Sequence, residues 1–189
     1  MEVESLSLPE VRLITPRIFQ DKRGRFLETW SEQRFTDAGL PVSFRQDNVS
    51  ISVRGVLRGL HCQHPREQGK LVTVLRGRVF DVVVDARLGS PRFGRWAGVE
   101  LDDVHLKQLY VPPGFLHGFV ALADDVVFTY KCTEQYDPSA EFSVRWDDPT
   151  IGIEWPVEAP LLSAKDEEAP LLSAVPREQL PTYSSLAGK

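Results

Sequence analysis

Short runs of alternating hydrophobic and polar residues follow one another along the first part of this chain. The ranges 11–19, 25–30 and 44–53 have this pattern, and turn residues at 21–24 separate the first two. Because successive side chains of a strand point to opposite faces, a period of two predicts strands with one buried face. Pro16 predicts an edge position for the first strand, since proline cannot donate a hydrogen bond to a neighbour.

From Leu71 onward, short valine-rich runs are separated by connectors rich in glycine, proline and aspartate. The runs are 71–75, 78–85, 96–101, 107–111, 118–122, 126–132 and 142–146. Short strands at this spacing, without long helices between them, indicate an all-β sandwich or barrel. No change in composition marks a linker that would divide the chain.

Only short peripheral helices are expected. Ser31 is a candidate N-cap, and Gly39 follows at the expected end of that helix. The range 163–172 can hold one turn of helix, which Pro170 limits. The last residues, 183–189, are expected to be frayed.

Composition restricts the class of protein. A length of 189 residues suits a single domain spanning 1–189. The net charge of −5 argues against general nucleic-acid binding, and no apolar run is long enough to span a bilayer. Cys62 and Cys132 form neither a disulfide framework nor a zinc pattern, and the N-terminus lacks a signal-peptide pattern. We therefore expect a cytoplasmic protein without nucleic-acid or membrane partners.

The stretch 55–70 combines three side chains that can act on an anionic substrate. The guanidinium of Arg58 can bind phosphate or carboxylate oxygens in a fork. His61 can serve as a general base, and Lys70 can stabilise an oxyanion formed beside it. Together they suit a negatively charged substrate that must lose a proton. A polar hairpin with solvated charges is the alternative that this stretch alone leaves open.

The histidines also raise the question of a metal site. Metal-binding cupin barrels carry Gly-x5-His-x-His and later Pro-x-Gly-x2-His, and the spacings from Gly55 to His61 and up to His117 resemble these motifs. However, Gln63 occupies the position of the second histidine, and alternation directs His64 away from His61. Since three or more ligands are usual for a divalent metal, we predict that no metal is bound.

Two further side chains are candidates for proton transfer. Tyr130 lies at the end of an apolar run, and a tyrosine near a cation can act as a general acid. Asp166 can orient His61 and raise its basicity, as the acid of a catalytic dyad does. The alternatives are a packed tyrosine with a bonded hydroxyl and a surface aspartate.

Several short segments match one known pattern in order along nearly the whole chain. They are 15–19, 21–28, 45–48, 56–61, 69–70, 80–85, 90–91, 111–119, 130–133, 146–149 and 162–166. Together they resemble the dTDP-sugar epimerase family, the dTDP-4-dehydrorhamnose 3,5-epimerases. The resemblance implies a cupin-type jelly roll (a double-stranded β-helix barrel) without metal or cofactor. It also implies a homodimer in which N-terminal segments cross between subunits.

The resemblance also assigns roles. It implies that His61 is the base, supported by Asp166, that Tyr130 is the acid on the opposite face, and that Lys70 stabilises the enolate oxygen. The substrate would be a dTDP-4-keto-6-deoxyhexose. Positions that match nucleotide-binding or sugar-binding residues are Phe19, Arg23, Phe26, Glu28, Gln46, Asp47, Asn48, Arg58, His117, Tyr136, Glu141 and Lys165.

The expected activity is epimerisation of dTDP-4-dehydro-6-deoxy-D-glucose at C3 and C5 to dTDP-4-dehydro-L-rhamnose. Cys62, Gln135 and the segment 142–144 depart from the usual family pattern. We expect these positions to lie near the sugar, so an epimerase of one centre is an alternative. The same barrel could also belong to a metal-dependent cupin enzyme or to a non-catalytic sugar-nucleotide-binding module, because fold alone does not determine function.

Overall fold

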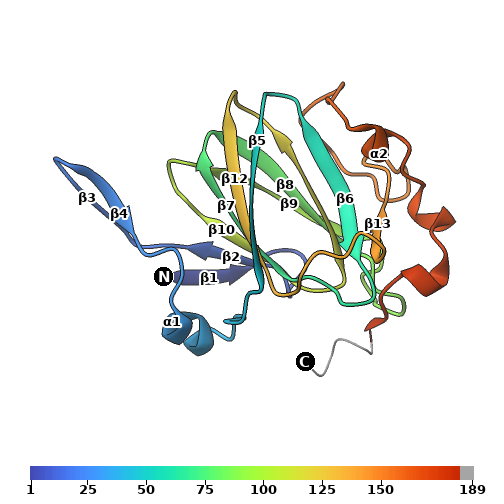
Figure 1. Ribbon diagram of the computed structural model, residues 1–189, viewed down its shortest axis with the longest axis horizontal. Coiled ribbons are helices and arrows are strands. Elements are labelled where there is room, and N and C mark those ends of the chain that lie inside the picture. The colour runs from blue at the N-terminus through green and yellow to red at the C-terminus, as the bar shows by residue number, and fades with distance from the viewer. Residues whose placement is uncertain (184–189) are drawn as a thin grey trace.

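Two antiparallel sheets face each other across a shared core (Figure 1). The structure is a computed structural model and describes residues 1–183, so the expected frayed end lies outside the described residues, except for Tyr183. The all-β prediction is confirmed, and two facing antiparallel sheets are the arrangement of a jelly roll. No helix among the described residues is long and apolar enough to cross a membrane.

The larger sheet has six strands and the smaller sheet has five. In spatial order the larger sheet consists of β1 (Glu2–Ser5), β2 (Arg12–Thr15), β10 (Gln108–Val111), β7 (Lys70–Arg76), β12 (Val126–Cys132) and β5 (Gln46–Ser52). The smaller sheet consists of β13 (Glu141–Ser143), β6 (Leu57–Gln63), β11 (Phe115–Ala121), β8 (Arg78–Asp85) and β9 (Trp96–Asp102).

The remaining elements lie outside the two sheets. A hairpin of β3 (Ile18–Asp21) and β4 (Gly24–Leu27) projects away from them (Figure 1). The helices are α1 (Glu32–Asp37), α2 (Ala164–Glu167) and the single 3₁₀ turns η1 (Leu172–Ala174) and η2 (Arg177–Gln179). Both predicted short helices are therefore present.

Apolar side chains fill both faces of the smaller sheet. Between the sheets, Val83 packs in one cluster with Phe119 and Phe128, whose rings stack at 4.1 Å. On the outer face, Leu60 and Cys62 pack with the C-terminal segment, which contributes Ile151, Leu172, Val175 and Leu180. Burial of this second face holds the C-terminal segment, and with it α2, beside β6 (Figure 1).

A β-bulge in β6 decides which side chains face the interior. His117 of β11 pairs with His61, whereas Phe119 pairs with Arg58, so two steps along β11 oppose three steps along β6. Residues three apart in a regular strand point to opposite faces, but the extra residue brings Arg58 and His61 to the same face. Gly59 makes this possible: its φ is +136°, and a Cβ there would lie 2.6 Å from the backbone of Gly118.

Some predicted boundaries were wrong. The range 11–19 is two strands, because the chain leaves the larger sheet at Pro16 and forms the separate hairpin. Proline therefore ends the ladder here and does not occupy an edge. The range 25–30 stops being a strand after Leu27, and of the range 142–146 only the first two residues are in a strand, at the end of β13. The stretch around His61 is a central strand, so the alternative of a solvated hairpin is wrong.

Candidate active site

A hydrogen-bonded pair of His61 and Asp166 stands at one wall of the space between the sheets. The imidazole Nε2 lies 2.6 Å from Oδ1 of Asp166, whose side chain is buried. Ser163 caps α2 and donates its hydroxyl to the other carboxylate oxygen at 2.8 Å. Burial raises the pKa of Asp166, but the hydrogen bonds from His61 and Ser163 outweigh it, so this pKa lies below its usual range.

This pairing determines which imidazole nitrogen can accept a proton. A carboxylate only accepts hydrogen bonds, so Nε2 carries the hydrogen that Asp166 accepts. In a neutral imidazole the lone pair then resides on Nδ1, for which the described residues provide no hydrogen-bond partner. His61 thus has the geometry of a general base held in one tautomer by an aspartate.

Cationic and aromatic groups surround this base inside the barrel. His117 lies opposite His61 in the register, its ring stacks near Phe128, and its Nε2 lies 2.9 Å from Asp81. Burial raises the pKa of Asp81, while His117 and Lys70 act in the opposite direction. Within the described chain, Lys70 forms no ion pair within 4.0 Å, so its ammonium is available to a developing negative charge.

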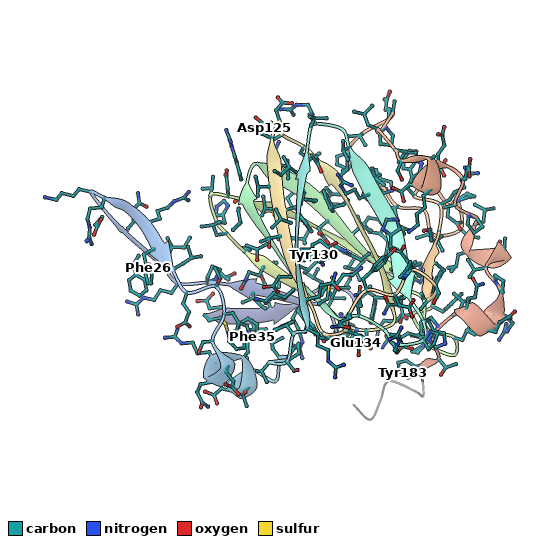
Figure 2. All side chains as sticks on the ribbon, in the orientation of Figure 1. Phe26, Phe35, Asp125, Tyr130, Glu134 and Tyr183 are labelled. Carbon is teal, nitrogen blue, oxygen red and sulfur yellow. The ribbon has the colours of Figure 1, made fainter. Side chains whose placement is uncertain are left out.

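Tyr130 stands on the other wall. It lies on β12 of the larger sheet, packs against the core between the sheets, and occupies the middle of the molecule in Figure 2. Burial raises the pKa of its phenol, with smaller contributions from Cys132 and Glu141. The phenol is therefore protonated at neutral pH. An imidazole on one sheet and a phenol on the facing sheet can address the two faces of one ligand.

Strand β5 adds polar groups to the same wall. Its alternate residues Gln46 and Asn48 are joined by a hydrogen bond of 3.0 Å, and Asn48 lies beside the thiol of Cys132. Further along β5, Ser52 accepts a hydrogen bond of 3.2 Å from Nε of Arg58. The rest of that guanidinium can bind phosphate oxygens.

A chain of polar contacts forms the rim of the site. Glu141 accepts hydrogen bonds from the hydroxyl of Tyr136 and from the ammonium of Lys165, which precedes Asp166 on α2. Burial raises the pKa of Glu141, but the hydrogen bond from Lys165 and the charge of His61 outweigh this effect. The pKa of Glu141 therefore lies below its usual range. The structure therefore brings these three predicted binding residues together beside the base.

Four predicted binding residues lie elsewhere. Phe19 and Phe26 pair across the β3–β4 hairpin with exposures of 50% and 72%, and Figure 2 places Phe26 far from Tyr130. At the hairpin turn, Arg23 pairs with Asp21. Glu28 forms an ion pair with Arg34 of α1, at 3.3 Å. Within one chain, the hairpin does not reach the base.

Some other predicted residues point away from the site, because successive side chains of a strand lie on opposite faces of the sheet. Asp47 points to the outer face of β5, where it binds Lys131 at 2.9 Å, so its side chain does not join Gln46 and Asn48. Cys62 and Phe142 pack in the core behind the smaller sheet, and burial raises the pKa of the Cys62 thiol to about 12. The expectation that these two departures lie near the sugar is therefore wrong.

Sequence reasoning missed several residues that support the site. Asp81 holds His117, Ser163 holds Asp166, and Ser52 holds Arg58. Asp81 had a signal in the sequence, because an aspartate inside a valine-rich strand needs a buried partner. Ser163 also had one, because a serine three residues before an acidic residue is the spacing of a capped helix start, whereas no local pattern joins Ser52 to Arg58 six residues later.

The histidines do not form a metal centre. Each of His61, His64 and His117 pairs with a different carboxylate. In the part of the chain that the structure describes, no three His, Cys, Asp or Glu residues are grouped so that they could hold a metal ion. The amide of Gln63 bonds backbone groups of Arg66, Gln135 and Asp137.

Known proteins resemble this chain over most of its length. The family model described as dTDP-4-dehydrorhamnose 3,5-epimerase matches residues 5–174. The chain is 49% identical to the dTDP-4-dehydrorhamnose 3,5-epimerase of Pseudomonas aeruginosa, over 89% of this chain and 94% of the relative. It is 44% identical to a dTDP-4-dehydrorhamnose 3-epimerase of Streptomyces niveus, over 98% and 91% of the two chains.

A solved structure extends the likeness to the fold. The crystal structure of the dTDP-6-deoxy-D-glucose-3,5-epimerase of Legionella pneumophila, in complex with dTDP-4-keto-L-rhamnose, superposes with a TM-score of 0.94. Its sequence is 46% identical, and the match covers 96% of this chain and 98% of that one. The predicted cupin-type jelly roll is confirmed by this match. The chain belongs to the dTDP-4-dehydrorhamnose 3,5-epimerase family, an isomerase family.

Proposed function

We propose that this protein epimerises dTDP-4-dehydro-6-deoxy-D-glucose at C3 and C5 to dTDP-4-dehydro-L-rhamnose, as one catalytic domain spanning 1–189. The reaction would serve biosynthesis of dTDP-L-rhamnose or a related deoxysugar and use no cofactor. The observation that carries this proposal is an imidazole held by Asp166 on one sheet, facing the phenol of Tyr130 on the other. A cytoplasmic location is supported by the two free cysteines, since reducing compartments keep thiols free.

The chemistry follows from the C4 ketone. Hydrogens at C3 and C5 are both α to this carbonyl, so Nδ1 of His61 can remove either one as a proton. The electron pair of the C–H bond moves to the C4 oxygen, and the ammonium of Lys70 stabilises the resulting enolate. Tyr130 then donates its phenolic proton to the opposite face of the same carbon, which inverts that centre. Imidazolium and phenolate return to their starting states by proton exchange with water.

The binding residues fit the rest of the substrate. Arg58 is assigned to the diphosphate, which explains a local cation on an acidic protein. Gln46, Asn48, His117, Tyr136, Glu141 and Lys165 are assigned to the sugar and nucleotide, and their position around the base supports this.

Proton NMR in deuterated water tests the proposed activity. With dTDP-4-keto-6-deoxyglucose and no added cofactor, we expect deuterium to enter both C3 and C5. Entry at one carbon only would identify a single-centre epimerase, a candidate that the likeness to the Streptomyces niveus 3-epimerase favours. No entry at either carbon would contradict the proposal and leave a binding protein.

We also propose a homodimer in which the β3–β4 hairpin serves the site of the partner subunit. The hairpin carries Phe19, Arg23 and Phe26 but does not reach His61 in its own chain. On the outer face of β5, Val49 and Ile51 are 64% and 69% exposed, an apolar strip that a second copy would cover. A second chain would therefore bury this strip and complete the site.

Mixing two inactive variants tests this arrangement. One variant carries His61→Ala, and the other carries Arg23→Ala with Phe26→Ala. If the hairpin acts across the dimer, unfolding and refolding the two together should restore roughly a quarter of wild-type exchange, since half of the dimers are mixed and each has one complete site. No recovery would contradict the crossed arrangement, and a mass equal to one chain of 21.3 kDa in sedimentation would contradict the homodimer itself.

A further inference from the structure

One buried hydroxyl beside the base has no partner. Among the described residues, the Oγ atom of Ser143 is one of four buried side-chain polar atoms without a hydrogen bond. Ser143 lies on β13, directly opposite His61 in the register of the smaller sheet. An unsatisfied buried hydroxyl is costly, so its presence next to a catalytic base requires an explanation.

The backbone pattern makes Ser143 and His61 close neighbours. The adjacent pair, Leu60 and Val144, exchanges two backbone hydrogen bonds of 3.1 and 2.9 Å. In an antiparallel ladder the next pair is then a non-hydrogen-bonded one, in which side chains approach most closely. Ser143 is therefore the side chain of β13 that stands beside the imidazole.

Its side chain also faces the site. Phe142 and Val144, which flank it, pack in the core behind the sheet. Glu141, two residues away and hence on the same face as Ser143, forms the rim contacts with Tyr136 and Lys165. Ser143 is only partly buried as a residue, and a serine side chain can exchange among three staggered rotamers, each of which directs the hydroxyl differently.

The two acidic carbons of the substrate differ in what they would offer this hydroxyl. C3 carries a hydroxyl group, which can both donate and accept a hydrogen bond. C5 carries a methyl group, which can do neither. When C3 is under the imidazole, Ser143 gains a partner, whereas C5 in the same place leaves the serine hydroxyl facing a methyl group.

We propose that Ser143 is a specificity-determining residue, which favours proton removal at C3 by hydrogen bonding the substrate hydroxyl on that carbon. The proposal rests on the proposed function and deepens it. According to this proposal, one side chain beside the base determines how fast a proton is removed at C3 relative to C5. A site that hydrogen-bonds a substrate hydroxyl discriminates against a pose that lacks this hydroxyl, because its own polar group is then unpaired.

The test compares separate deuterium incorporation rates at C3 and C5 in wild type, Ser143→Ala and Ser143→Thr. In the alanine variant we expect the C3 rate to fall about tenfold relative to the C5 rate, the effect of one lost hydrogen bond. Threonine keeps a hydroxyl, so its ratio should remain near that of wild type. Ser173→Ala is the control: it removes a serine hydroxyl from the exposed side of η1, outside the site, and should leave the ratio unchanged.

An unchanged ratio in Ser143→Ala would overturn the inference, even if both rates fell together. Equal losses in the alanine and threonine variants would indicate a structural role and would also overturn it, as would a wild type that exchanges C5 alone. If wild type exchanges C3 alone, the same tenfold fall with rescue by threonine is expected at that carbon. A wild type that exchanges neither carbon would instead contradict the proposed function.

Discussion

Replacing His61 with alanine should abolish deuterium exchange at both C3 and C5 while dTDP still binds. The variant loses the nitrogen that accepts the proton, and general base catalysis contributes a factor of about 10² to 10⁴. Nucleotide affinity should change little, because Arg58 and the β5 amides are unchanged. Exchange is measured by proton NMR in deuterated water, and dTDP affinity by calorimetric titration.

Two further variants separate loss of the base from loss of the fold. Alanine also leaves the buried carboxylate of Asp166 without its imidazole partner, which destabilises the protein by about 1–3 kcal/mol. His61→Gln keeps an amide donor for that carboxylate but provides no base, so it should be equally inactive and better folded. His105→Ala, at an exposed histidine paired with Asp102, should exchange like wild type. Wild-type exchange in either His61 variant would remove this residue from its role.

The sequence predicted the architecture well because one physical signal repeats in it. Strand after strand alternates between residues for the core and residues for the other face, so the all-β assignment and most strand ranges follow from a period of two. The exceptions have local causes. The strand ends near Pro16 because the chain leaves the larger sheet there to form the β3–β4 hairpin. The alternation of hydrophobic and polar residues does not show this change of direction.

The sequence predicted which residues act in the site but not how they meet, because some of them are far apart in the chain. His61 and Asp166 are 105 residues apart, and what joins them is burial of the C-terminal segment against the back of the smaller sheet. No local pattern encodes such a contact. The bulge that turns Arg58 and His61 to one face is equally invisible, because regular alternation predicts opposite faces for residues three apart.

The same limit explains the wrong placement of Cys62. Its position next to His61 in sequence suggested a neighbour in the pocket, but adjacent residues of a strand face opposite ways. Ser143, on a different strand, is the closer neighbour of the base. Proximity to a catalytic residue in a β-protein is therefore better judged from cross-strand register than from sequence distance.

Replacing Tyr130 with phenylalanine should separate exchange from inversion. His61 can still remove a proton and return a deuteron to the same face, so deuterium should enter the substrate while its configuration is retained. Formation of the epimer should fall by a factor of about 10² to 10⁴, the contribution of a positioned general acid. Because burial raises the pKa of this phenol above its usual value, wild type holds the required proton throughout neutral pH.

NMR distinguishes the two outcomes, since the coupling constants of the sugar ring report configuration and the loss of proton signals reports exchange. Tyr183→Phe is the matched control, because it removes a hydroxyl but keeps the aromatic ring that lies over Arg87, and it should invert like wild type. Inversion at the wild-type rate in Tyr130→Phe would assign the acid to another group. If the variant loses both exchange and inversion, the phenol assists proton removal itself. His61 and Tyr130 would then act in one concerted step.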